Sequence, residues 1–180
     1  MNESHMQHGE HWNGEDLTGW IVSEKLDGVR AYWDGAVMWS RSGREIPLPP
    51  EWHAALPEGI ELDGEIYDGI DGLSRCSTAA RTGKFTASMR FRVFELPKSA
   101  DSYMNRLASA DTALRGNPIV STIPAVQARS TRHAMTLARA ALSTGGEGVM
   151  ARHPGISTKS GRTNDLLKIK AEELEAWSEA

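Results

Sequence analysis

The alternation of apolar and polar residues in the first half of the chain predicts a group of β-strands. Apolar and polar side chains largely alternate over residues 60–67 and 89–96, which is the pattern of strands with one buried face. β-prone runs at 20–22 and 29–33 flank a polar bend, and a third run at 37–41 follows an Asp-Gly hairpin dipeptide. We therefore expect these segments to be strands of one or more sheets.

Helical spacing dominates the second half of the chain. Apolar residues recur every three or four positions over residues 100–114 and again over 130–142, and glycines follow both segments. A short helix or a loop is predicted near residues 52–56, and short helices are predicted near 77–81 and 172–177. The sequence therefore predicts two long helices and two or three short ones.

The order of these elements indicates the fold class. Two short strands are predicted at 148–152 and 166–170, joined by a loop rich in Gly, Ser and Thr. All segments together predict an α+β domain of mostly antiparallel strands with flanking helices. Residues 1–19 have few periodic apolar positions, so we expect a lead-in segment there. Residues 172–180 are rich in glutamate and are expected to form an acidic C-terminal tail.

Length and composition limit the class of protein. A chain of 180 residues with 39% apolar and 24% charged residues is typical of one soluble globular domain. The single cysteine, Cys76, excludes an intrachain disulfide and fits a reducing compartment. No apolar run reaches the length of a membrane span, and no secretory signal is visible. We therefore expect a cytoplasmic protein without a membrane partner.

The charge distribution allows a nucleic-acid partner despite a net charge of −4. Five basic residues and no acid lie between residues 75 and 92, and five basic residues and one acid lie between 152 and 170. Local positive fields of this kind can attract a polyanion even when the total charge is negative. An ordinary solvated surface is the alternative for either cluster.

The most distinctive stretch is Lys25-Leu26-Asp27-Gly28-Val29-Arg30, which lies between the two β-prone runs. Lys25 and Asp27 are expected on the bend, where Gly28 supplies backbone freedom. A lysine held against apolar walls loses solvation of its charged form, which frees the amine to act as a nucleophile. A surface turn with a Lys–Asp pair is the alternative.

This stretch resembles the KxDGxR motif of the covalent nucleotidyltransferases, which include ATP-dependent DNA ligases, RNA ligases and mRNA capping enzymes. The longer string over residues 22–35, VSEKLDGVRAYWDG, is most similar to the minimal ATP-dependent DNA ligases of bacteria and phages, including the ligase E type. The resemblance implies that Lys25 accepts AMP and that Asp27 and Arg30 are catalytic residues. Ligases of the E type usually carry an export signal, and none is visible here.

Two acidic stretches match further motifs of the resemblance. Asp63-Gly64-Glu65 is similar to the DGE strand, whose two acids lie on one face and can hold ribose hydroxyls or a divalent metal ion. Glu147, in Glu147-Gly148-Val149, is similar to the EGV glutamate that serves a metal ion. The resemblance therefore implies that Asp63, Glu65 and Glu147 are metal ligands and that Glu65 also contacts the nucleotide.

Aromatic and basic residues complete the match. Phe94 corresponds to the aromatic residue that stacks on the purine, although an alternating Phe is usually a core residue. Lys168 and Lys170 resemble the KxK strand, which places two ammonium groups toward the phosphates. Arg41, in Ser-Arg-Ser-Gly, resembles an arginine that contacts phosphate, and Arg30 is expected at the ribose or phosphate. A solvated arginine is the alternative for either of these two.

The resemblance implies a DNA ligase adenylation domain over residues 20–171 that requires ATP and Mg²⁺ or Mn²⁺. It would form a lysyl-AMP intermediate, transfer AMP to the 5′-phosphate at a nick in duplex DNA, and join the strands. Its partners would be nicked duplex DNA and ATP. It would be a monomer, and it would act in DNA repair, replication or recombination. The runners-up are an RNA ligase and a relative that binds nucleotide or nucleic acid without sealing.

Several points stay open in the sequence. DNA ligases of this family continue into an OB-fold domain, which is not visible here, and the sequence does not tell whether it was removed or is naturally absent. The motifs alone do not separate DNA from RNA as substrate, nor a bacterial from a phage host. The six histidines show no zinc spacing, and His8 and His11 are expected to be solvated in the lead-in segment.

Overall fold

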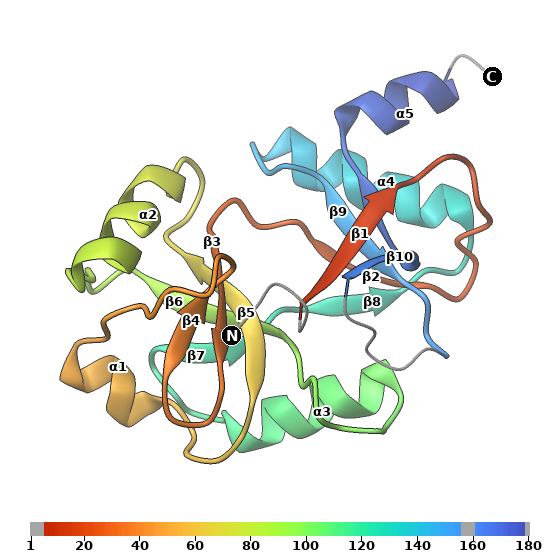
Figure 1. Cartoon of the computed structure of the whole chain (residues 1–180). Helices are drawn as coiled ribbons and strands as arrows, with labels where there is room; N and C mark the ends of the chain where they lie inside the picture. The colour runs from red at the N-terminus through yellow and green to blue at the C-terminus, as the bar shows by residue number, and fades with distance from the viewer. Residues whose placement is uncertain (1–5, 156–160, 179–180) are drawn as a thin grey trace.

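The computed structural model describes residues 6–155 and 161–178, which form two five-stranded sheets with helices around them (Figure 1). We call the sheet with strand order β1-β10-β9-β2-β8 sheet I. Its strands, in chain order, are β1 (Gln7–His11), β2 (Ile21–Glu24), β8 (Ala125–Gln127), β9 (Val149–Arg152) and β10 (Gly161–Ile169). Helices α4 (Thr131–Ser143) and α5 (Ala171–Ser178) pack against this sheet.

Sheet II has the strand order β4-β3-β5-β6-β7. Its strands are β3 (Val29–Trp33), β4 (Met38–Ser40), β5 (Leu62–Tyr67), β6 (Arg90–Glu95) and β7 (Val120–Thr122). The accompanying helices are α1 (Pro50–Ala55), α2 (Leu73–Thr82) and α3 (Tyr103–Ala113). Helix α2 contacts β3 and β5, while α3 contacts β6 and β7.

Each sheet has its own apolar core. The core of sheet II contains large side chains, among them Trp33, Trp52 and Phe91, and the ring of Trp52 lies 4.3 Å from that of Phe85. The core of sheet I contains many alanines, which let α4 approach the strands closely; they include Ala134, Ala138 and Ala151. A smaller cluster of Ile21, Tyr103 and Leu107 joins a strand of sheet I to helix α3.

The structure confirms the α+β class and most of the predicted elements. All the strands and helices predicted between residues 20 and 155 are present, and the pairings are mostly antiparallel. Two pairings are parallel, β1 with β10 and β6 with β7. The strands β7 and β8 were not predicted, because a strand of three residues is too short to show alternation.

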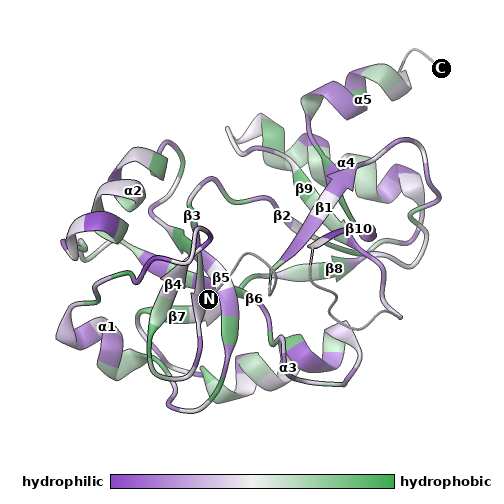
Figure 2. Cartoon of the chain, in the orientation of Figure 1, coloured by the Kyte–Doolittle hydropathy of each residue, from purple (hydrophilic) through white to green (hydrophobic). Residues whose placement is uncertain are grey.

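The prediction of a lead-in segment over residues 1–19 is wrong for residues 7–11, which form β1 at the edge of sheet I. Its sequence, QHGEH, is polar throughout (Figure 2). The strand is held by its parallel pairing with β10, more than a hundred and fifty residues away, and not by a hydrophobic face of its own: Gln7 pairs with Gly161 and His11 with Lys168. The other domain boundaries predicted from sequence stay predictions.

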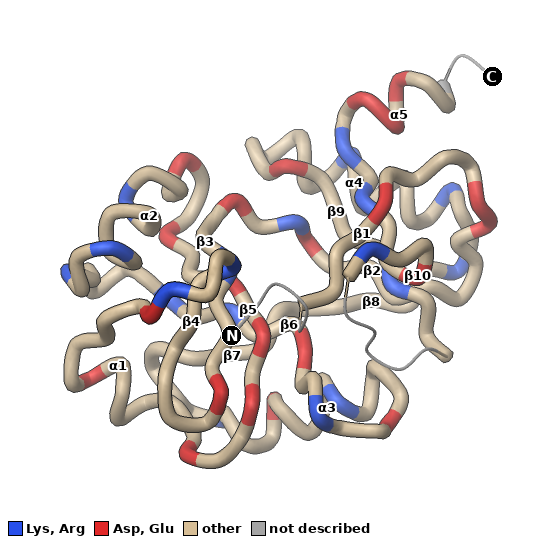
Figure 3. Tube along the Cα trace, viewed as in Figure 1, with Lys and Arg blue, Asp and Glu red and all other residues tan. Residues whose placement is uncertain are grey.

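The end of the chain is helical, as expected for residues 172–177. Acidic residues lie along α5, as Figure 3 shows, and Leu174 between them is buried in the core of sheet I. The ring of Trp177 lies 5.0 Å from that of Trp12. Among the described residues, no helix is long and apolar enough to cross a membrane.

Candidate active site between the two sheets

A cavity of about 360 Å³ opens between the two sheets. Strands β1, β2, β9 and β10 of sheet I line one side, and β3, β5 and β6 of sheet II line the other. Seven residues that the sequence predicted to bind the nucleotide are all on its wall: Lys25, Arg30, Arg41, Glu65, Phe94, Lys168 and Lys170.

Lys25 lies on the segment that crosses from sheet I to sheet II. Strand β2 ends at Glu24 in sheet I and β3 begins at Val29 in sheet II, so the two strands are not paired as a hairpin. The Lys25 N–H donates to the carbonyl of Gly148 at 2.9 Å, which fixes the start of this crossing. Gly28 is required for close packing, because a Cβ there would lie 2.2 Å from the carbonyl oxygen of Ile66.

The side chain of Lys25 forms an ion pair with Glu147. Both groups are partly exposed, at 21% for Lys25 and 34% for Glu147. Glu147 lies two residues before β9 and is followed by Gly148, whose positive φ of 111° and missing Cβ allow the chain to pass close to the carbonyl of Ile169. The lysine and the glutamate, 122 residues apart in sequence, are thus brought together, while the predicted metal role of Glu147 stays a prediction.

Arg30 is fixed by two partners. Its Nε and Nη2 donate to the two carboxylate oxygens of Asp63 at 3.1 and 2.7 Å, and its Nη1 donates to the backbone carbonyl of Gln7 at 2.6 Å. The guanidinium carbon lies 5.3 Å from the centre of the Phe94 ring. Both Asp63 oxygens therefore accept from Arg30 in a buried pair, and its predicted role as a metal ligand stays a prediction.

Glu65 lies opposite Arg30 in the register of β3 and β5 and faces the cavity. Burial raises the pKa of its carboxyl group to about 7, and the nearby Arg30 and Lys25 only partly offset this rise. Of the two predicted acids, Asp63 and Glu65, only Glu65 lines the cavity and can contact a ligand there.

Lys168 and Lys170 are separated by one residue at the end of β10, so both point to the same side of the strand. Burial and the neighbouring cations Arg162, Lys25 and Lys170 lower the pKa of Lys168. The backbone N–H of Lys170 donates to the carboxylate of Glu173 at 2.7 Å, which anchors this end of the strand to α5.

Two of the predicted residues lie at the margin of the site. Arg41, on the turn after β4, is exposed and reaches the cavity wall. Asp27 does not line this cavity; it lines a smaller hollow of about 40 Å³ on the other side of Lys25, together with Glu24, Asp71 and Glu147.

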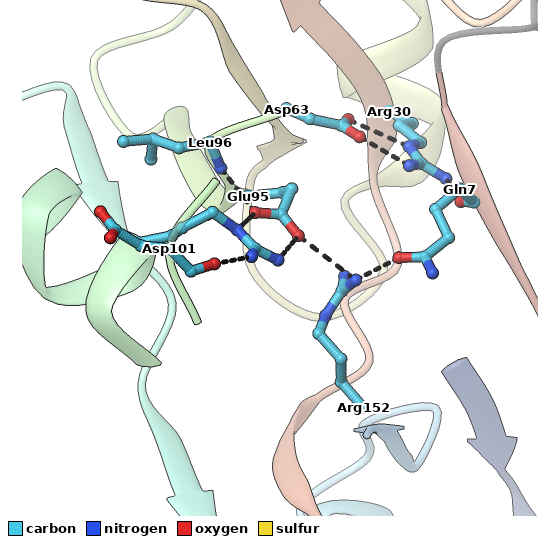
Figure 4. Close-up of polar contacts among 8 residues, drawn as sticks. Gln7, Arg30, Asp63, Glu95, Leu96, Asp101 and Arg152 are labelled. Carbon is cyan, nitrogen blue, oxygen red and sulfur yellow. Dashed lines mark hydrogen bonds and ion pairs between the residues drawn. The ribbon is translucent and has the colours of Figure 1, made fainter. Parts of the chain in front are cut away.

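A buried network that the sequence did not predict lies behind the cavity (Figure 4). The two carboxylate oxygens of Glu95 accept from Arg106 at 2.6 and 2.9 Å, and Arg152 lies 3.3 Å from the same carboxylate. Arg152 also donates to the side-chain oxygen of Gln7. Sequence alternation contained one signal of this network, because Glu95 follows Phe91 and Val93 on the buried face of β6.

The acidic residues of the site fit a divalent cation only together with a substrate. Among the described residues, no three His, Cys, Asp or Glu side chains gather closely enough to hold a metal ion by themselves. Mg²⁺ is usually held by one or two carboxylates and by substrate phosphates, with water completing the shell. Glu65 on the cavity wall and Glu147 beside Lys25 are the carboxylates that suit this mode of binding.

Lys25 lies between the two sheets on the wall of a cavity that several cations and the ring of Phe94 also line, an arrangement that fits a covalent nucleotidyltransferase domain. No protein-family model matches the chain. The DNA ligase of Haemophilus influenzae is 27% identical over 163 aligned residues, and the match covers 88% of this chain and 60% of that ligase. A Lig E DNA ligase structure superposes with a TM-score of 0.81 at 26% identity, covering 92% of this chain and 68% of the other.

More distant structures have the same fold. The Chlorella virus DNA ligase-adenylate gives a TM-score of 0.75 at 23% identity, covering 91% of this chain and 66% of that one. The ATP-dependent DNA ligase of bacteriophage T7, in complex with ATP, gives a TM-score of 0.70 at 16% identity, covering 94% of this chain and 69% of that one. The chain is therefore a homologue of ATP-dependent DNA ligases and has the fold of their adenylation domain. It spans 60% of the length of the Haemophilus ligase.

Proposed function

We propose that this chain is the catalytic domain of an ATP-dependent DNA ligase and that Lys25 is its AMP acceptor. The observation that carries the proposal is the position of Lys25, which lies on the cavity wall in an ion pair with Glu147. Phe94 supplies an aromatic face for adenine on one side of the cavity, and Lys168 and Lys170 supply positive charge on the other.

The first step transfers an adenylyl group to the enzyme. The Lys25 amine, after it loses its proton, forms a bond to the α-phosphorus of ATP, while the bond from that phosphorus to the bridging oxygen breaks and pyrophosphate leaves. Glu147 holds the amine in place before the attack. The reaction concentrates negative charge on the phosphates, which fixed cations stabilise more effectively than water does. Arg41, Lys168 and Lys170 are the cations placed to do so.

A Mg²⁺ or Mn²⁺ ion, when bound, would neutralise phosphate charge and help pyrophosphate to leave. Glu147 and Glu65 would hold it. Arg30 would contact the ribose or α-phosphate while Asp63 keeps its guanidinium oriented. Asp27, outside the main cavity, would act on the far side of Lys25.

The later steps use DNA. AMP passes from Lys25 to the 5′-phosphate at a nick, and the 3′-hydroxyl then displaces AMP to form the phosphodiester bond. Basic residues on α2 and just after it would contribute phosphate contacts; Arg81 and Lys84 are exposed there (Figure 3). A cytoplasmic location, a monomeric state and a role in repair, replication or recombination remain predictions of the sequence.

A sealing assay tests this function. Nicked duplex DNA and an equally long nicked RNA duplex would each be incubated with ATP and Mg²⁺, with the Lys25→Ala variant as the matched control. We expect sealing of nicked DNA by the parent chain and none by the variant on a 5′-phosphate nick. The variant should still seal a nick that already carries 5′-adenylate, because that substrate bypasses the lysine.

The runners-up predict different results. Faster sealing of RNA than of DNA would identify an RNA ligase. Nucleotide binding without sealing of any of the three substrates would identify a relative that has kept the fold and lost the activity.

A further inference from the structure

Gln7 is the residue through which strand β1 joins both walls of the cavity. Its side chain is buried, with an exposed fraction of 4%, although it is polar and lies near the start of the described chain. Its backbone carbonyl accepts from Nη1 of Arg30 at 2.6 Å, and its side-chain oxygen accepts from Nη1 of Arg152 (Figure 4). One residue thus contacts a guanidinium group from each sheet.

The charges of the network explain why a further hydrogen-bond acceptor is needed at this position. Three guanidinium groups, those of Arg30, Arg106 and Arg152, share the carboxylates of Asp63 and Glu95. Both oxygens of Glu95 are taken by Arg106, and Arg152 reaches only one of them, at 3.3 Å. A buried guanidinium N–H without an acceptor is costly, and the two carbonyl oxygens of Gln7 supply acceptors that the carboxylates do not.

Both arginines face the cavity. Arg30 and Arg152 line it, as does Gln7 itself, and Arg152 lies 4.5 Å from the centre of the Tyr103 ring, which is also on the wall. The position of Gln7 depends in turn on the pairing of β1 with β10, the strand that carries Lys168. A shift of Gln7 would therefore move the nucleoside side of the cavity relative to the phosphate side.

We propose that Gln7 is a positioning residue for nucleotide binding, which holds Arg30 of sheet II and Arg152 of sheet I in one fixed arrangement. This inference rests on the proposed function, because it assumes that the cavity takes ATP. It extends the site to strand β1, which lies outside all the ligase-like motifs described above. Gln7 acts through the two arginines and has no role in the bond-forming steps.

The test compares Gln7→Leu, which keeps bulk but removes the side-chain acceptor, with Gln7→Glu, which keeps an acceptor oxygen. ATP dissociation constants would be measured by titration calorimetry in the Lys25→Ala background, and kcat and KM of adenylylation with Lys25 present. Loss of one buried acceptor should weaken ATP binding and raise KM about tenfold in Gln7→Leu while kcat changes less than about threefold. Gln7→Glu should stay within about threefold of the parent in both.

Two controls separate positioning from general destabilisation. Asn117→Leu removes a partly buried amide that bonds Ala55, Ile119 and Val120 away from the cavity, so it should lower Tm and leave ATP binding unchanged. The double variant Gln7→Leu/Arg152→Met should bind ATP no more weakly than Arg152→Met alone, because the side-chain oxygen that Gln7→Leu removes contacts Arg152, while the backbone contact with Arg30 remains. Additive losses would contradict the proposal, as would an equal loss of affinity in Asn117→Leu.

The outcomes also separate this inference from the proposed function. If the parent chain binds ATP and forms no lysyl-AMP, the enzymatic proposal fails while the dissociation constants still decide the role of Gln7. If lysyl-AMP forms normally and Gln7→Leu binds ATP like the parent, only the role of Gln7 is refuted. A parent chain that does not bind ATP would overturn both.

Discussion

The two sheets that enclose the cavity are assembled in different ways. Sheet II forms largely from strands that are neighbours in sequence, because β3 pairs with both β4 and β5, and β5 pairs with β6. Sheet I joins strands from both ends of the chain, and α4 covers it with alanines. The large aromatic core of sheet II supports Arg30, Glu65 and Phe94, whereas sheet I presents the two late lysines.

This difference indicates that the two sheets contact different parts of the nucleotide. Sheet II carries the groups suited to a nucleoside, and sheet I carries those suited to phosphates. Lys25 lies on the segment between them, where both parts of one nucleotide would meet. Substitutions on the nucleoside side of the cavity, which Gln7 of β1 helps to hold, should therefore change mainly nucleotide affinity. Substitutions around Lys25 and of Lys168 and Lys170 should change mainly the rate of the chemical step.

The largest effect is expected for Lys25→Arg. The guanidinium group keeps the positive charge beside Glu147 but does not lose its proton at usable pH, so it cannot attack phosphorus. Lysyl-AMP formation should be undetectable, while ATP affinity should remain within about threefold of the parent because the cavity walls are intact. Intact-mass measurement and calorimetry check the two parts, and a normal adduct on this variant would show that another residue is the acceptor.

The next largest effect is expected for Glu147→Gln, which removes a charge and keeps the shape. Adenylylation should fall by about a hundredfold, as for other losses of one preorganised charge contact. Glu51→Gln, at an exposed position in α1, is the matched control and should be normal. The rates would be measured at limiting Mg²⁺; a parent-like rate there would refute both the ion-pair role and the metal role of Glu147.

A smaller effect on affinity is expected for Phe94→Leu. Loss of the aromatic face should weaken ATP binding roughly tenfold, because stacking on a base is worth on the order of 1–3 kcal/mol. Phe91→Leu is the matched control on the same strand, since Phe91 is fully buried on the opposite face of β6. It should lower Tm and bind ATP normally. The reverse pattern for the two variants would make Phe94 a core residue.

The smallest effect concerns stability and pH. Burial raises the pKa of Glu65 to about 7 in the folded chain from an ordinary value of 4.5, so between these pH values the unfolded state loses a proton that the folded state keeps. The contribution of Glu65 to stability therefore falls as pH rises through this window and is constant above it. Glu65→Gln should remove this slope, a difference of about 3 kcal/mol between pH 4.5 and 8.

Urea unfolding without nucleotide and with EDTA checks this slope, with Glu58→Gln, at an exposed position, as the control. Equal pH slopes in the parent and in Glu65→Gln would mean that Glu65 is ionised in the folded chain throughout the window.

The elements of sheet II and the individual motifs could be predicted from the sequence because their signals are local. Alternation over residues 60–67 and 89–96 marks β5 and β6, and a lysine, aspartate and arginine within six residues mark the crossing segment. Seven of the predicted residues consequently line the same cavity. Their chemical roles are not tested by this geometry and stay predictions.

The remainder depends on contacts between distant parts of the chain. Strand β1 has no hydrophobic alternation, and its pairing with β10 could not be read from five polar residues. Gln7 contacts Arg30, which lies 23 residues away in sequence, and Arg152, which lies 145 residues away. Asp63 and Glu65 share the spacing of a two-carboxylate site, but the strand pairing that places Arg30 beside them commits Asp63 to an ion pair.

The most direct test of the account is the mass of the chain after incubation with ATP and Mg²⁺. The account predicts an added mass of one adenylyl group, mapped by peptide analysis to Lys25 and removed by pyrophosphate, which reverses the first step. An adduct on Lys168 or Lys170, or no adduct on a chain that binds ATP, would contradict the assignment of Lys25 as the nucleophile.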